Sequence, residues 1–83
     1  MADAYVKVEV GKDMIYYIHT ENFPNFFKEY LETPSRSMIA RHAEIAIDVR
    51  NNELVKCRQT LEYLIDNGFP KPVMKIKFDE SVK

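Results

Sequence analysis

The fold class is decided by residues 44–68, which read EIAIDVRNNELVKCRQTLEYLIDNG. Residues 44–47 have the alternation of a strand, and Asn51 or Asn52 is a suitable N-cap for a helix that follows. The apolar residues after this cap recur at the spacing of one helix face, and they are Leu54, Cys57, Leu61, Leu64 and Ile65. Gly68 is a typical helix end. The stretch therefore predicts a strand that leads into a long amphipathic helix.

The residues before this stretch predict a hairpin of two strands. Residues 5–10 alternate strictly, with three valines on one face and charged side chains on the other. Gly11-Lys12-Asp13 supplies a tight connection, and residues 14–19 are rich in β-branched and aromatic side chains. We therefore expect an N-terminal pair of antiparallel strands.

A first helix is predicted from about Phe23 to Glu32. Asn22 is a suitable N-cap, and Pro24 stands where the first turn of a helix tolerates proline. The apolar stripe of this helix has helical spacing and consists of Phe23, Phe27, Tyr30 and Leu31. Residues 35–43 fit either a turn of helix or a packed loop, and the sequence leaves both open.

The C-terminal part predicts one more strand. Residues 73–78 alternate apolar side chains with lysines, and residues 79–83 are expected to form a frayed tail. The sequence as a whole predicts one α+β domain over residues 1–83. Its mixed sheet of about four strands carries two main helices on one face, in the order β-β-α-(turn)-β-α-β.

Composition limits the classes of function. The chain has 83 residues, and its 12 Lys and Arg against 13 Asp and Glu give a net charge of −1 with both signs interspersed. This balance disfavours the clustered basic surface of a nucleic-acid-binding protein. No apolar run approaches the ~20 residues that span a bilayer. The single cysteine cannot form an internal disulfide and the first residues lack a secretory pattern, so we expect a soluble protein of the cytoplasm or nucleus.

Residue types that carry catalysis or bind metals occur without a recognisable motif. His19, His42 and Cys57 do not have the spacing of a zinc site, and Cys57 falls on the apolar face of the predicted helix. The two glycines, Gly11 and Gly68, are too far apart for a phosphate-binding loop. We therefore expect no cofactor, no metal and no enzymatic activity.

A protein-interaction domain, acting as an adaptor or a regulator, best accounts for a small domain with surplus aromatic side chains. The expected partner is another protein or a second copy of the chain. The candidate anchors are Phe26, Tyr30, Phe69 and Met74. Phe26 lies beside the helix stripe, so we expect it either on the surface or in a wider buried stripe. Residues 69–72 serve either as a structural stop or as a docking loop.

Binding of single-stranded nucleic acid is the alternative function. One of Tyr16 and Tyr17, together with Lys75 and Lys77, could place an aromatic ring and positive charge on one face of the sheet. Bases stack on such rings, and lysines neutralise phosphates. Alternation must turn one of the two tyrosines toward the core, and the lysines equally suit an edge strand that avoids pairing.

The order of these elements resembles the Skp1 and Elongin C branch of the BTB/POZ superfamily. The resemblance rests on residues 5–19, 25–31, 44–56, 61–64 and 68–70. It implies a non-enzymatic adaptor that joins a ubiquitin-ligase scaffold to substrate receptors, or a domain that dimerises. The sequence departs from this pattern after Pro70, where the family continues into receptor-binding helices and this chain alternates like a strand.

Overall fold

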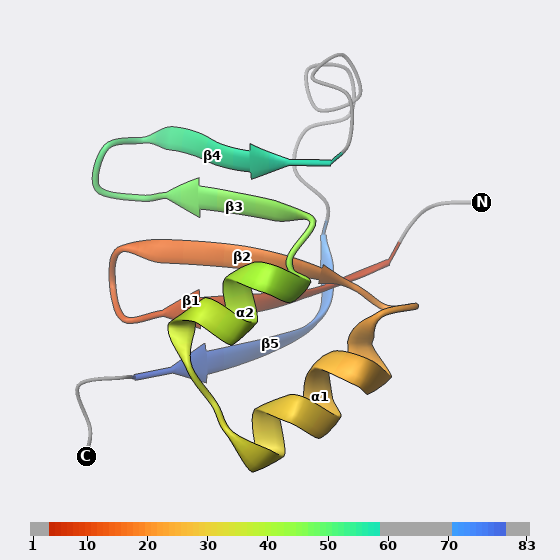
Figure 1. Cartoon of the computed structure of the whole chain (residues 1–83). Helices are drawn as coiled ribbons and strands as arrows, with labels where there is room; N and C mark the ends of the chain where they lie inside the picture. The colour runs from red at the N-terminus through yellow and green to blue at the C-terminus, as the bar shows by residue number, and fades with distance from the viewer. Residues whose placement is uncertain (1–3, 59–70, 80–83) are drawn as a thin grey trace.

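The computed structural model describes residues 4–58 and 71–79, which form a mixed five-stranded sheet and two helices (Figure 1). The elements are β1 (Tyr5–Val10), β2 (Met14–His19), α1 (Phe23–Glu32), α2 (Arg36–His42), β3 (Ile45–Asp48), β4 (Glu53–Cys57) and β5 (Pro72–Phe78). The strands lie in the order β4-β3-β2-β1-β5. Strand β5 runs parallel to β1, whereas the other neighbours are antiparallel. The predicted α+β class with a mixed sheet is confirmed.

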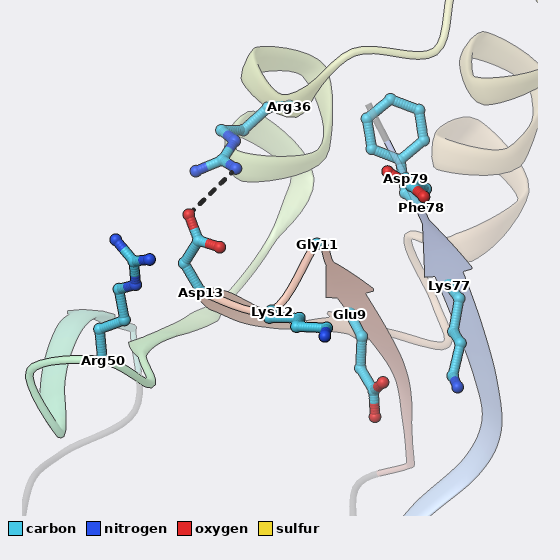
Figure 2. A pocket seen from close by; sticks show the side chains of 9 residues that line it. All are labelled: Glu9, Gly11, Lys12, Asp13, Arg36, Arg50, Lys77, Phe78 and Asp79. Atoms are coloured by element: carbon cyan, nitrogen blue, oxygen red, sulfur yellow. Dashed lines mark ion pairs between the residues drawn. The ribbon is translucent and has the colours of Figure 1, made fainter. Parts of the chain in front are cut away.

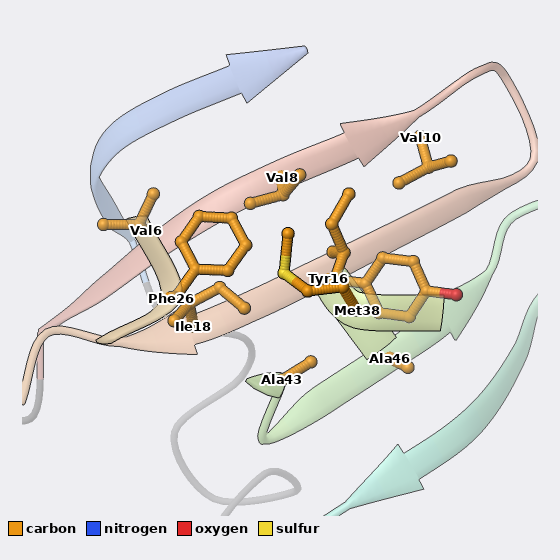
Figure 3. Close-up of a cluster of buried hydrophobic side chains, with 10 residues drawn as sticks. Val6, Val8, Val10, Tyr16, Ile18, Phe26, Met38, Ala43 and Ala46 are labelled. Atoms are coloured by element: carbon orange, nitrogen blue, oxygen red, sulfur yellow. The ribbon is translucent and has the colours of Figure 1, made fainter. Parts of the chain in front are cut away.

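Three valines of β1 anchor the core between the sheet and the helices. Val6, Val8 and Val10 are 2%, 0% and 0% exposed, and they belong to the same buried cluster as Phe26 of α1 and Met38 of α2 (Figure 3). Strict alternation puts all three valines on one face of β1, as the sequence predicted. The predicted hairpin with β2 is also confirmed.

Both helices cover the same face of the sheet (Figure 1). Helix α1 has its proline in the first turn as predicted, but the Asn22 side chain makes no capping hydrogen bond. The segment that the sequence left open contains helix α2. Ser35 Oγ accepts a hydrogen bond from the Met38 backbone N at 3.1 Å, and this cap begins a helix that buries Met38 and Ile39.

The predicted long helix is wrong at its beginning, because Glu53–Cys57 form strand β4. The chain reverses after β3, where the Asp48 carboxylate accepts hydrogen bonds from Asn51 backbone N at 3.1 Å and from Asn51 Nδ2 at 2.8 Å. Asn52 then adopts a φ of 52°, which asparagine tolerates better than most residues. The residues interpreted as a helix N-cap instead close a hairpin. The remainder of the predicted helix, residues 59–68, lies outside the described residues.

A β-bulge explains why the apolar residues of β4 have the spacing of a helix face in the sequence. Ile45 pairs with Cys57 and Ile47 pairs with Leu54, so a step of two residues in β3 matches a step of three in β4. The extra residue lets Leu54 and Cys57 pack against the same face of the sheet. A spacing of three is also the spacing of a helix face, so periodicity alone does not separate the two structures here.

The two faces of the sheet carry separate apolar clusters. One face, which we call the helix face, packs against α1 and α2. On the opposite face, Tyr5, Tyr17 and Ile45 are each at most 6% exposed, and Leu54 and Cys57 pack against them. Cys57 is half-buried in this cluster, so the prediction of a small packing residue is correct although its element is a strand.

Candidate interaction surface

Helix α1 divides its apolar side chains between the core and the surface. Phe26 is fully buried, whereas Phe27 is 38% exposed and Leu31 is 67% exposed. The Phe27 ring stacks on the Phe23 ring with their centroids 5.3 Å apart, and on the Tyr30 ring with their centroids 6.3 Å apart. Ring packing therefore fixes the position of an apolar side chain that faces solvent.

Tyr30 connects this side of α1 to strand β5. Its ring stacks on Phe26 with centroids 5.4 Å apart and meets the Phe78 ring edge-on at 6.1 Å. Met74, Ile76 and Phe78 lie on the helix face of β5, because they pair with the three core valines of β1. Met74 is 42% exposed. The α1–β5 surface is defined here as Phe27, Tyr30, Leu31, Met74 and Phe78.

Strand β5 lies at one edge of the described sheet, and among the described strands it pairs with β1 alone. Its pairing with β1 is regular from Met74 to Phe78, and Val73 is an extra residue at a bulge before this stretch. Lys75 and Lys77 are exposed and point away from the helix face. An edge strand of this kind is a template for pairing with another extended chain.

The structure brings two of the four predicted anchors, Tyr30 and Met74, to the α1–β5 surface. Of the two interpretations left open for Phe26, the surface position is wrong, because its ring contacts Phe23, Tyr30 and His42 and the side chain is 0% exposed. The wider buried stripe is the correct interpretation of this residue. Phe69 lies outside the described residues.

Sequence reasoning missed Phe27 and Leu31 as surface residues because it assigned them to the buried stripe of α1. The core contacts instead follow Phe23, Phe26 and Tyr30, which are also at helical spacing. A helix with two adjacent apolar stripes does not reveal from its sequence which one faces the sheet.

His42 joins the two helices through side-chain hydrogen bonds. Its Nε2 lies 2.9 Å from Glu29 Oε1, and its Nδ1 lies 3.1 Å from Asn22 Nδ2, which also donates to the His42 carbonyl oxygen at 3.2 Å. Hydrogen bonds from His42 and then from Arg41 hold the pKa of Glu29 below its usual value.

His19, the other histidine considered for metal binding, also contacts neighbouring residues. His19 Nδ1 accepts a hydrogen bond from the Glu21 backbone N at 3.1 Å, and the His19 ring packs edge-on against Tyr5 at 5.2 Å. Among residues 4–58 and 71–79, no group of three or more histidine, cysteine or carboxylate side chains is arranged to hold a metal ion. Within the same residues, no helix is long and apolar enough to cross a membrane.

The two tyrosines considered for nucleic-acid stacking are both covered. Tyr16 is 5% exposed in the core on the helix face, and Tyr17 is 6% exposed on the opposite face. Burial and the nearby Glu9 carboxylate raise the pKa of Tyr17. Tyr17 does pair across the sheet with Lys7, which pairs with Lys75. The lysines therefore share a face with Tyr17, but its ring does not offer a surface on which a base can stack.

Comparisons of this chain with protein-family models, with curated proteins and with solved structures found no match. The resemblance to the BTB/POZ superfamily stays a prediction.

Proposed function

We propose that this chain is a non-enzymatic protein-interaction domain that binds an extended segment of a partner protein along strand β5. The observation that carries the proposal is an edge strand on which Met74 is 42% exposed, in contact through Phe78 and Tyr30 with a helix on which Phe27 is 38% and Leu31 is 67% exposed. Backbone pairing at the edge supplies affinity, and alternate side chains of the added strand supply specificity.

The chemistry of β5 specifies the kind of segment that fits. On the helix face, an added strand meets Met74 and the outer side of α1, so apolar side chains suit these positions. On the opposite face it meets Lys75 and Lys77, so acidic side chains suit the alternate positions. The expected partner is therefore an extended segment that alternates apolar and acidic residues.

A second copy of the chain fits the same edge less well. Pairing β5 with β5 of another copy places Lys75 and Lys77 opposite or diagonal to the same lysines, and like charges at such positions are destabilising. For this reason the proposal favours a different protein over a homodimer.

The proposal is tested by titrating the ¹⁵N-labelled chain with a peptide of about seven residues that alternates valine and glutamate. A peptide that alternates valine and lysine is the control ligand. We expect saturable amide shifts along β5 and α1 with the acidic peptide alone. We also expect Lys75→Glu to reverse the preference between the two peptides, because it inverts one charge beside the added strand.

A matched pair of variants tests whether the peptide binds the α1–β5 surface or any exposed apolar side chain. Leu31→Ser removes an aliphatic side chain that is 67% exposed on α1, and Val55→Ser removes one that is 59% exposed on β4, at the other edge. Leu31→Ser should weaken peptide binding by up to about tenfold, whereas Val55→Ser should leave it unchanged. Equal loss in both variants, or equal binding of both peptides, would contradict the proposal.

A further inference from the structure

The backbone of β5 offers hydrogen-bonding groups at fixed positions along the edge of the described sheet. The Gly11 backbone N donates to the Phe78 carbonyl oxygen at 2.9 Å, so this carbonyl group faces β1. The N–H and C=O groups of one strand residue point to the same side, and those of the next residue point to the other side. The N–H and C=O groups of Ile76 and Phe78 therefore face β1. Those of Lys75 and Lys77 face away from β1, toward the edge.

A hydrogen bond on the other side of β1 leads to the same assignment. The Thr20 backbone N, just after β2, donates to the carbonyl oxygen of Ala4, just before β1, at 3.0 Å. The even-numbered residues of β1 therefore direct their N–H and C=O groups toward β2, and the odd-numbered residues direct theirs toward β5. The bond from Gly11 to β5 continues this alternation. Because β5 pairs with β1 alone among the described strands, the N–H and C=O groups of Lys75 and Lys77 have no strand partner in that part of the chain.

The side chains of these two lysines lie on the face of the sheet opposite the helices. Figure 2 looks into the open pocket where β1 and β5 end, and it shows the Lys77 side chain on the same side as Glu9 and on the other side from Phe78. In an added strand, the residue directly opposite each lysine places its own side chain on this face. An acidic residue at each of these two positions therefore lies beside an ammonium group, and the apolar residue between them lies on the helix face, opposite Ile76.

We propose that the bound segment lies antiparallel to β5 and that its acidic residues form the hydrogen bonds to the backbone of Lys75 and Lys77. In an antiparallel pair, the residue directly opposite each lysine both donates and accepts, so three consecutive ligand residues satisfy all the outward groups. A parallel segment reaches the same groups from the positions on either side, so it needs five residues, one of them beside the bulge at Val73. Antiparallel binding therefore orders less of the ligand for the same hydrogen bonds. This inference rests on the proposed function and adds the direction and register of the bound segment.

Amide hydrogen exchange followed by NMR tests the assignment of the edge on the protein itself. In the free chain, we expect the amides of Lys75 and Lys77 to exchange rapidly, whereas those of Ile76 and Phe78, which bond to β1, exchange slowly. At about ten times its Kd, the valine–glutamate peptide should slow exchange at the two lysines by about tenfold, because about a tenth of the chains remain free. Equal protection of all these amides in the free chain, or unchanged exchange at the lysines in the complex, would overturn the inference.

Two N-methylated versions of the peptide test its direction. N-methylation removes a backbone N–H, so it weakens binding where that N–H faces β5 and is tolerated where it faces solvent. Methylation at the glutamates should weaken binding by about tenfold or more, whereas methylation at the valines, the matched control, should change it by less than about twofold. A larger loss from the valine-methylated peptide, or equal binding by all three peptides, contradicts this inference and leaves the proposed function standing. Failure of the unmodified peptide to bind refutes both.

Discussion

Substitution of two adjacent phenylalanines of α1 should lower stability by clearly different amounts. Phe26 is 0% exposed and its ring contacts Phe23, Tyr30 and His42, so Phe26→Ala loses both its burial and the volume it fills. The expected loss of stability is about 3–5 kcal/mol. Folded domains have about 0.05–0.15 kcal/mol of stability per residue, or about 4–12 kcal/mol for this chain, so the variant loses a large share of its total.

Phe27→Ala provides the comparison within the same helix turn. Its side chain is already 38% exposed, so the buried area lost is smaller and the space left behind opens to solvent. We expect a loss of about 1–2 kcal/mol in stability, together with weaker binding of the acidic peptide. Equilibrium unfolding in urea, followed by circular dichroism, measures both variants.

Phe26→Leu keeps this prediction testable if Phe26→Ala does not fold. It should cost about 1–2 kcal/mol and lower the melting temperature by about 4–16 °C, without weakening peptide binding to the folded protein. The reasoning fails if the two alanine variants differ by less than about 0.5 kcal/mol, the usual scatter of such comparisons. It also fails if Phe27→Ala is the more damaging of the two.

Three further changes test local features by chemical denaturation. Gly11→Ala should cost about 1–2 kcal/mol, because a φ of 57° strains a residue with a Cβ although no atom lies closer than 3.4 Å to that Cβ. Ser35→Ala should cost about 1 kcal/mol by removing the cap of α2, whereas Ser37→Ala, inside the same helix, should be neutral or stabilising. Because the pKa of Glu29 is lower in the folded than in the unfolded chain, its stabilisation is complete above pH 4.5 and is lost as pH falls through the folded pKa. Glu29→Gln should therefore reduce the decline in stability below pH 4.5, and an unchanged decline would contradict this assignment.

The sequence predicts elements well where one pattern has one interpretation. The alternation of valines in β1 and the first-turn proline of α1 each led to the correct element. The prediction failed at β4, where a bulge gives Leu54 and Cys57 a helical spacing and Asn52 closes a turn instead of capping a helix. Local propensity does not contain this information, because the bulge exists through pairing with β3.

The candidate sites were predicted less completely than the fold, for a related reason. Asn22 was interpreted as a helix cap, but its amide bonds to His42, twenty positions away. The open pocket at the end of β1 and β5 likewise combines the β1–β2 turn, the start of α2, the β3–β4 turn and the end of β5. Contacts of this kind depend on strand order, and strand order is not visible in the spacing of residues along one segment.

The two edges of the described sheet also differ in how they resist further pairing, and this difference favours an interaction role for β5. Strand β4 is interrupted by a bulge, which disturbs the template for another strand. Strand β5 is regular from Met74 to Phe78 and is guarded by two lysines on one face. Lysines repel a second copy of the same strand but attract an acidic one. Under the proposed function, the same side chains that disfavour self-association would select a partner of opposite charge, so protection of the edge and recognition of a ligand are compatible roles for β5.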